Sequence, residues 1–555
     1  IFISNVAGAA LFIAVRRKNF SPAGCGENHI MFHAQIIAKN LCFVILSNEK
    51  VIEQVQCLFF STKKVHSAQI KNRESQMKNQ KIKNFLLWFL SDTMFLFSSA
   101  SALSVRWARQ NYPMQSFRNV YFVLSSDTSG HDSGTFFSAL KGFLIPSLMI
   151  YIVYRIVLFI LKKKNINLSA YVFAKLNALY MIAVVLLSVI LLKAWNYPLF
   201  ARKVNGKPVS SEFYKENYTD PFEVKIIAPQ IKRNLILIFM ESMESSYATV
   251  KDGGVFLEDI IPNLSRTAKE NVNFSADSLI GGGYNLEGTS WTSAGLISKL
   301  TGVPYFNPFI TENGNVYCLR RALSLGDVLK SQGYNLVFSM GSEKQFENRD
   351  AFLEGHGFDV HDIVWYKEHG FISKYYRVFW GFEDLKLYEA AKTELTELAK
   401  NSSPFCYGML TIDTHFPYGY KCPLCKDDFS HPMMNILRCA DSQVNEFINW
   451  CKVQSWFSNT TIVIMGDHCY LNAPDNNFID ECSPLSKKQI NERRRFFNLI
   501  INPSSKINID MQKNRDFSSF DMFPTVLECL GNQIEGGRLA LGQSLLSKNP
   551  TLVEK

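Results

Sequence analysis

The chain has 555 residues, which is too long for one ordinary hydrophobic core, so we expect at least two structural parts. Its formal net charge of +10 would suit a nucleic-acid-binding protein, but no recognised binding motif accompanies the charge. Much of the excess lies in clusters that border apolar stretches, which is the pattern of membrane proteins. Composition therefore excludes a single small domain and argues against a nucleic-acid partner.

The N-terminal part, residues 1–80, is basic and difficult to assign. Residues 1–15 are apolar and precede the basic residues 16–18, as in the remnant of a spanning helix or a signal-like segment. Residues 19–80 are rich in Lys, Asn and Gln and show no sustained apolar period. We predict a cytoplasmic or poorly ordered region there.

Three apolar stretches follow within residues 81–195, and each is close to the roughly 20 residues that a helix needs to cross a bilayer. Their bounds are residues 85–104, 142–161 and 176–195. Soluble core helices rarely run so long without a polar face. We therefore predict a transmembrane region of about three helices, which makes the chain an integral membrane protein.

The flanking lysines give the orientation. Lys81 and Lys83 precede the first predicted span, and residues 162–164 join the second span to the third. Both flanks should be cytoplasmic under the positive-inside rule, so everything after Trp195 should lie outside. We predict a multi-pass protein of the inner (cytoplasmic) membrane, with a connector at residues 196–232 and a catalytic domain on the periplasmic or extracytoplasmic side.

Residues 233–548 show an alternating α/β pattern and are predicted to form that catalytic domain. Short apolar stretches typical of buried strands occur at residues 235–240, 335–339, 406–411, 461–465 and 497–501. Helical patterns occur between or after them, at residues 321–332, 383–400, 433–451 and 520–530. Continuous apolar strands separated by helices predict a mainly parallel sheet covered on both faces.

Candidate reactive residues follow the predicted strands directly. They are Glu241, Asp413, His415, Asp467 and His468. In an open α/β sheet the ligand crevice lies beyond the carboxyl ends of the strands. The sequence therefore predicts an active site at that edge of the sheet.

A further motif, NLEGTSWTSAGLISKLTGVP at residues 285–304, indicates a tight turn that opens into a helix. We expect the Thr289 hydroxyl at the helix N-terminus, which favours anions. With Glu241, Asp467 and His468 it would form a mixed oxygen and nitrogen ligand set suited to Zn²⁺ or Mn²⁺. A threonine hydroxyl needs such a cation or a base to become a nucleophile.

Four motifs, IFMES (238–242), GTSWTSAGLISKLTGVP (288–304), TIDTHFPYGY (411–420) and MGDH (465–468), carry a family resemblance. In order and spacing they resemble the membrane-anchored lipoteichoic acid synthase and phosphoglycerol transferase group of the alkaline phosphatase superfamily. The segment RCAD (438–441) and the late DMFPTVLECLG and LGQSLL bring the chain closest to the phosphoglycerol transferases of periplasmic glucans. The resemblance implies an alkaline phosphatase-like α/β fold.

The resemblance also implies roles for the residues that match the family motifs. Glu241, Thr289, Asp467 and His468 correspond to ligands of one divalent cation, Mn²⁺ or Zn²⁺, with Thr289 also the nucleophile. His415 corresponds to a histidine near the phosphoryl group, where it would bind the headgroup or assist proton transfer.

Two further positions bear on substrate recognition. Arg349 lies where lipoteichoic acid synthases place a phosphate-binding arginine, and the alternative is a surface ion pair with a neighbouring carboxylate. Met340 stands about where those synthases carry a histidine, which argues against that branch.

The implied reaction is transfer of phosphoglycerol from phosphatidylglycerol to a periplasmic or cell-surface glycan through a phospho-threonine intermediate. Two alternatives stay open. One is a phosphoethanolamine transferase or phosphodiesterase on the same scaffold, and the other is a catalytically inactive membrane receptor or structural module.

Nine of the twelve cysteines lie from Cys318 onward. The pair Cys422 and Cys425 has the CxxC spacing of zinc and redox motifs, but no second CxxC follows at the spacing of a zinc ribbon. In an external domain a disulfide is favoured, and we expect Cys422 or Cys425 to pair with Cys439.

Overall fold

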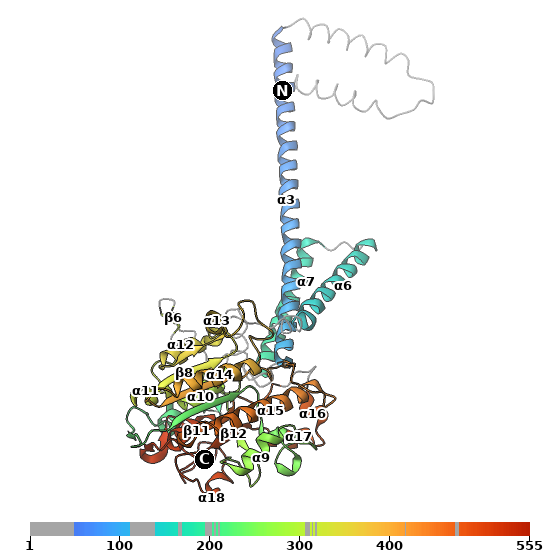
Figure 1. Cartoon of the computed structure of the whole chain (residues 1–555). Coiled ribbons are helices and arrows are strands. Elements are labelled where there is room, and N and C mark those ends of the chain that lie inside the picture. Colours follow the sequence, from blue (N-terminus) through green and yellow to red (C-terminus); the bar gives the residue numbers. More distant parts are fainter. Residues whose placement is uncertain are drawn as a thin grey trace, which may run out of the picture. The chain divides into compact units, whose positions relative to one another are not determined.

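A computed structural model shows how the predicted elements are arranged (Figure 1). It describes residues 49–111, 139–164, 169–194, 203–204, 207–208, 211–305, 311–312, 315–316, 319–416, 418–471 and 477–555. The expectations for residues 1–48 lie outside this set.

Among the described residues, three helices are long and apolar enough to cross a membrane, which agrees with the three predicted spans. Helix α3 covers Glu49–Asn111, α6 covers Ile145–Lys163 after the π-helical turn η1 at Leu140–Leu144, and α7 covers Ala170–Ala194. Their candidate spans are Ser75–Gln110, Leu140–Lys163 and Val172–Leu191.

The expectation of a poorly ordered region at residues 19–80 is wrong for residues 49–80, which belong to helix α3. The sequence of this part keeps no sustained apolar period, so hydrophobic periodicity does not reveal the helix. Its Gln, Lys, Glu and Met residues are good helix formers on intrinsic propensity alone.

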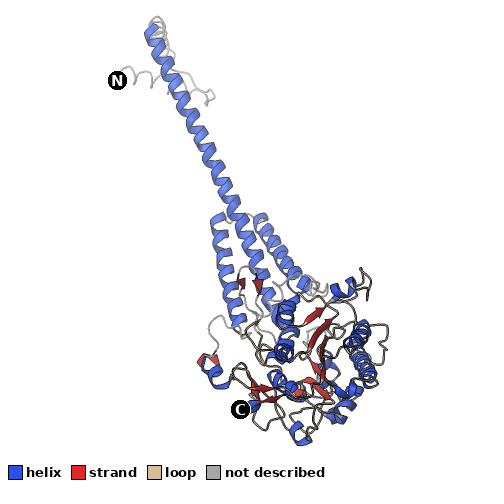
Figure 2. Ribbon diagram, turned by 60° about the vertical axis from the view of Figure 1, so that its left-hand side comes forward, coloured by secondary structure: helices blue, strands red, loops and turns tan. Residues whose placement is uncertain are grey.

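Residues 233–548 contain the predicted α/β sheet, whose strands lie among covering helices (Figure 2). Within the described residues, seven strands pair in the order β5-β12-β11-β4-β10-β8-β9. They are β4 (Asn234–Met240), β5 (Gly282–Gly283), β8 (Asn335–Met340), β9 (Asp359–His361), β10 (Phe405–Leu410), β11 (Thr460–Gly466) and β12 (Phe496–Ile501). Strands β11, β4, β10, β8 and β9 are parallel, whereas β12 runs antiparallel to β11 and to β5. The mainly parallel sheet is confirmed.

The remaining strands form two-stranded pairs outside this sheet. They are β1 (Lys203–Val204) with β2 (Lys207–Pro208), β3 (Ile226–Ile227) with β13 (Gln533–Ile534), β6 (Thr311–Glu312) with β7 (Asn315–Val316), and β14 (Arg538–Leu539) with β15 (Gly542–Gln543).

Alternate side chains of each buried strand enter two separate cores. On one face, Leu235 and Leu237 of β4 pack with residues of α10 (Thr292–Thr301), α11 (Leu325–Ser331), α12 (Arg349–Gly355) and α19 (Met522–Cys529). On the other face, Ile236 and Ile238 pack with residues of α9 (Pro262–Glu270), α14 (Asp384–Leu398), α15 (Pro432–Lys452), α16 (Phe478–Cys482) and α17 (Lys487–Arg493). Both faces of the sheet are therefore covered, as the continuous apolar strands predicted. The remaining helices are α8 (Ser211–Asn217), α13 (Ile363–Glu368) and α18 (Ile509–Gln512).

The RCAD segment of α15 has a structural role. Asp441 is fully buried, and its carboxylate accepts hydrogen bonds from the backbone nitrogens of Asn263 (3.1 Å) and Leu264 (2.7 Å) in the first turn of α9. The N-cap residue of α9 is Ile261, which has no side-chain oxygen. Asp441, on α15, therefore supplies the hydrogen-bond acceptor that the N-terminus of α9 lacks.

We expect Asp441→Ala to lower the free energy of unfolding by about 1–2 kcal/mol, because it removes the acceptor for the first turn of α9. Thermal unfolding of the detergent-solubilised chain, followed by tryptophan fluorescence, measures the effect. Asp441→Asn is the matched control, since it keeps an oxygen acceptor and should lose less. Equal melting temperatures for wild type and Asp441→Ala would contradict this role.

Candidate metal centre

Three of the predicted cation ligands meet at the carboxyl ends of β4 and β11. One ligand atom from each of Glu241, Asp467 and His468 lies within 4.8 Å of the other two, and all three side chains are buried. The Nε2 atom of His468 is 3.3 Å from Glu241 Oε1 and 3.6 Å from Asp467 Oδ2. Residues more than 220 positions apart in the chain therefore converge on one point, as the sequence predicted.

The register of the sheet produces this convergence. Strands β4 and β11 are parallel neighbours in which Met240 is paired with Gly466, so the next residue of each strand, Glu241 and Asp467, emerges at the same edge. Ser242 then turns the chain with a left-handed backbone (φ 51°), which is uncommon for a residue other than glycine. Such a conformation is typical of functional sites, where the surrounding structure holds it in place.

Hydrogen bonds around the centre orient its ligands for a cation. The Ser242 backbone nitrogen donates to Asp467 Oδ1 (2.8 Å), and the Ser242 hydroxyl donates to Glu241 Oε1 (2.7 Å). His468 Nδ1 is 2.7 Å from the Cys469 carbonyl, so this nitrogen carries the proton in the neutral ring and Nε2 is left as an electron-pair donor. Asp467 Oδ2 is buried and has no hydrogen-bond partner among the described residues. These features fit a divalent cation bound between the three side chains.

The pKa of each of the three groups in the centre is changed by at least one of the other two. Burial raises the pKa of Asp467 to about 7, and the negative charge of Glu241 adds to this. Burial alone would also raise the pKa of Glu241, but the positive charges that the His415 and His468 imidazoles carry when protonated hold it well below its ordinary value. Burial opposes the charged form of His468, yet Asp467 and Glu241 raise the pKa of its ring to about 9. A buried excess of negative charge is what a cation would neutralise.

The structure brings Thr292, rather than Thr289, to these ligands. Thr292 Oγ1 is 3.1 Å from Glu241 Oε2 and 3.3 Å from His468 Nε2, and its side chain is partly exposed. Thr289 is fully buried, and its hydroxyl donates to the Leu286 carbonyl (2.8 Å).

The expectation that Thr289 lies at the helix N-terminus is also wrong, because α10 begins at Thr292. Gly288 takes a left-handed conformation (φ 81°) and Trp291 is extended. The turn that the sequence indicated therefore continues for two residues beyond Thr289, and the helix starts at Thr292.

The predicted His415 lies close to the centre. Its Nδ1 is 2.6 Å from the Phe416 carbonyl, and its ring centroid is 4.6 Å from that of Trp380. Burial lowers the pKa of His415, although the Glu241 carboxylate opposes the shift. The ring is therefore neutral at pH 7 and has one nitrogen available to accept a proton.

Asp413, another candidate from the sequence, has a different environment. Its Oδ1 accepts a hydrogen bond from the Asp384 backbone nitrogen (3.1 Å), while Asp384 accepts from the backbone nitrogens of Ile412 and Asp413. Burial and the charge of Asp384 raise the pKa of Asp413 to about 10. These reciprocal bonds tie the start of α14 to the loop that follows β10, and this loop carries His415.

Arg349 is buried, so the alternative of a surface ion pair is wrong. Its guanidinium donates to the backbone carbonyls of Phe346 (3.1 Å) and Glu343 (2.9 Å). Burial lowers the pKa of Arg349, and the nearby carboxylates of Glu347 and Glu241 oppose this shift. Because the Glu241 carboxylate acts on the pKa of Arg349, the guanidinium lies close enough to the centre to interact with it electrostatically.

Lys299 is a residue near the centre that sequence reasoning missed. It lies on α10, is buried, and donates from Nζ to the Asp467 backbone carbonyl (2.7 Å). Its ammonium also lies 4.1 Å from the centroid of the Phe496 ring, and burial lowers its pKa to about 7. In the sequence this lysine looks like an ordinary polar position in an apolar helix.

A buried ion pair supports the segment that follows His468. Arg494 forms an ion pair with Glu244, and Glu244 Oε1 also accepts from the Tyr470 backbone nitrogen (2.8 Å). Arg494 Nε lies 3.0 Å from Glu244 Oε2. Both side chains are almost fully buried, so this arginine belongs to the interior of the protein.

Comparisons with known proteins place the site in a family. The family model described as Sulfatase matches residues 233–532, which is more than half of the chain. Phosphoglycerol transferase I of Escherichia coli (strain 55989 / EAEC) is 31% identical over 299 residues, which cover 49% of this chain and 36% of that protein. The Escherichia fergusonii protein of the same name is 30% identical over 355 residues, covering 62% of this chain and 42% of that protein.

The chain thus spans less than half the length of these curated relatives. Among solved structures, the integral membrane protein lipooligosaccharide phosphoethanolamine transferase A from Neisseria meningitidis is 14% identical. That match has a TM-score of 0.44 and covers 80% of this chain and 83% of the other.

Proposed function

The chain belongs to the sulfatase family, and from this premise we propose that it transfers phosphoglycerol from phosphatidylglycerol to a glycan outside the membrane. The curated relatives named phosphoglycerol transferase I support the transferred group. The observation that carries the proposal is the convergence of Glu241, Asp467 and His468 with the Thr292 hydroxyl.

In this proposal Glu241, Asp467 and His468 hold one divalent cation, Mn²⁺ or Zn²⁺. The cation, when bound, would polarise a phosphoryl oxygen and favour the deprotonated form of a threonine hydroxyl. The structure supports Thr292 as the nucleophile, in place of Thr289, because this residue is partly exposed and its oxygen already touches two of the three ligands.

The reaction then has two displacements at phosphorus. In the first, a bond forms between Thr292 Oγ1 and phosphorus as the bond to diacylglycerol breaks, and the proton lost by Thr292 is balanced by the one that the departing diacylglycerol oxygen takes up. In the second, a glycan hydroxyl forms a bond to phosphorus as the bond to Thr292 breaks, and the proton lost by the glycan is balanced by the one that Thr292 Oγ1 regains. We propose that His415 binds the headgroup or transfers a proton. The positive charge of Arg349 would stabilise the negative charge of the phosphate.

The three apolar helices would anchor this domain beside its lipid substrate. Lys81 and Lys83 lie in the N-terminal part of the first candidate span, and the lysines at residues 162–164 lie at the end of the second, which supports a cytoplasmic location for those ends and an extracytoplasmic catalytic domain. Tethering raises the effective concentration of the active site relative to lipid headgroups.

Release of diacylglycerol from defined vesicles tests the proposal. The detergent-purified full chain, loaded with Mn²⁺ or Zn²⁺, is given phosphatidylglycerol or phosphatidylethanolamine vesicles with and without a soluble β-glucan. We expect release from phosphatidylglycerol at least about tenfold faster than from phosphatidylethanolamine, with phosphoglycerol on the glucan, since one lost headgroup contact is worth about a factor of ten.

The other outcomes correspond to the alternatives. A preference for phosphatidylethanolamine would identify a phosphoethanolamine transferase, and free glycerol phosphate without glucan labelling would identify a phosphodiesterase. No release from either lipid in the cation-loaded chain would favour the inactive receptor or structural module.

A further inference from the structure

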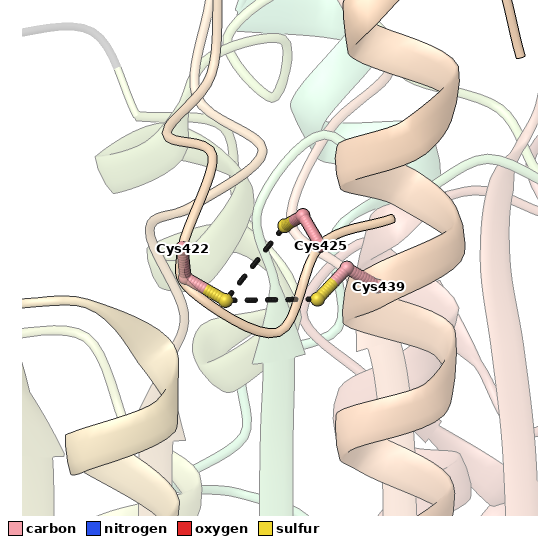
Figure 3. Close-up of side chains that lie close together, drawn as sticks. All are labelled: Cys422, Cys425 and Cys439. Atoms are coloured by element: carbon pink, nitrogen blue, oxygen red, sulfur yellow. Dashed lines mark hydrogen bonds between the residues drawn. The ribbon is translucent and has the colours of Figure 1, made fainter. Parts of the chain in front are cut away.

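A second cluster of side chains that could hold a metal ion lies outside the proposed catalytic centre. Cys422 and Cys425 belong to the loop that follows β10, and Cys439 lies on α15 (Figure 3). Cys422 Sγ is 3.6 Å from Cys439 Sγ and 3.7 Å from Cys425 Sγ, and all three sulfurs lie within 4.8 Å of one another. All three residues are present as thiols. The cysteines that were expected to form a disulfide therefore lie close together, but as a group of three thiols and not as a pair.

The spacing of the sulfurs suits a shared ion. Three thiolates bound to Zn²⁺ at about 2.3 Å and at tetrahedral angles lie about 3.8 Å apart. The observed separations of 3.6 and 3.7 Å are close to this value. A single disulfide would use two of the three sulfurs and leave the third in contact with it, whereas one metal ion uses all three.

Gln443 supplies an independent observation. It lies one turn after Cys439 on α15, is 5% exposed, and has its side-chain nitrogen 3.4 Å from Cys439 Sγ and 3.7 Å from Cys422 Sγ. Its Oε1 is buried and has no hydrogen-bond partner among the described residues. Since the two ends of an amide are nearly isosteric, a half-turn would point the oxygen toward the sulfurs. In one orientation the amide nitrogen donates a hydrogen bond to a thiolate, and in the other the amide oxygen can serve as a fourth ligand of the ion.

We propose that Cys422, Cys425 and Cys439 form a structural binding site for a thiophilic metal ion, with Zn²⁺ as the expected occupant. Soft thiolate ligands favour such ions over Mg²⁺ or Ca²⁺. The ion would join the loop after β10, whose first residues include His415, to helix α15. The proposal does not depend on the transfer reaction, because none of these residues belongs to the catalytic centre.

Zinc content of purified full-length variants tests the site. His468→Ala serves as the background, because it removes one of the catalytic ligands and so separates the two centres. Zinc per chain is measured by mass spectrometry of the elements after equilibration in a zinc buffer. We expect about one equivalent in the background and none when Cys439→Ala is added. Cys451→Ala is the matched control, since it removes another buried cysteine of α15 outside the cluster and should keep the zinc.

A second measurement covers the possibility that Cys439→Ala does not fold. Titrating Co²⁺ into the otherwise unaltered His468→Ala chain should produce thiolate-to-cobalt charge-transfer absorption in the near ultraviolet, and added Zn²⁺ should abolish it. Equal zinc in the Cys439→Ala and control chains, absent charge-transfer absorption, or a Cys439 disulfide in peptides alkylated without reduction would each overturn the proposal.

Discussion

Thr292→Ala is expected to lower diacylglycerol release from phosphatidylglycerol by about 10³-fold or more, as the loss of a covalent nucleophile does in other enzymes. The Thr292 oxygen contacts Glu241 and His468, and the residue is partly exposed. The variant loses the atom that would form the bond to phosphorus. Initial rates with cation-loaded protein and phosphatidylglycerol vesicles measure the effect.

Thr289→Ala is the matched control, because it removes the same hydroxyl three residues earlier in the same motif. The Thr289 hydroxyl bonds only to the Leu286 carbonyl among the contacts described, so its loss should cost about 1 kcal/mol of stability and at most several-fold in rate. Mass spectrometry of the quenched reaction should find the glycerophosphoryl adduct on Thr292. An adduct on Thr289, or equal losses in the two variants, would refute this assignment.

The sheet could be predicted from the sequence because its strands are fully buried and carry nearly unbroken apolar residues. The apolar residues at 235–240 and 461–465 could be assigned to strands without knowing which strands pair in the sheet. Parallel pairing then brings the residues after these strands to one edge, which is why Glu241, Asp467 and His468 were found by sequence position alone. Strands β5 and β9 were missed because two or three residues carry too little pattern.

The choice between Thr289 and Thr292 could not be made from the sequence, because it depends on where the turn ends and the helix begins. Both threonines belong to the same motif and differ by less than one helical turn. Arg349 was likewise undecided, since its burial depends on the packing of α12. The helix over residues 49–80 has no sustained apolar period to reveal it. In each case the missing information is tertiary contact or intrinsic propensity rather than local pattern.

Removing the cation is the second change for which we expect a large effect. Chelation of the purified chain should abolish diacylglycerol release, and added Mn²⁺ or Zn²⁺ should restore it, because the buried carboxylates would otherwise leave the phosphoryl charge uncompensated. His468→Ala should lower the rate of diacylglycerol release by about 10³-fold or more, as the loss of a group acting directly on the reaction does. Excess cation should not restore this rate.

His369→Ala provides the control for this variant, because that imidazole is exposed and stacks on Trp365 away from the three ligands. Its activity and cation dependence should match those of the wild type. Cation binding is measured separately by calorimetry, so that a folded chain unable to bind is distinguished from a misfolded one. Full turnover in thoroughly chelated protein would mean that Glu241, Asp467 and His468 act on the substrate without a metal ion. Their short separations would then require protons shared among them, since two buried carboxylates this close cannot both stay ionised without a compensating charge.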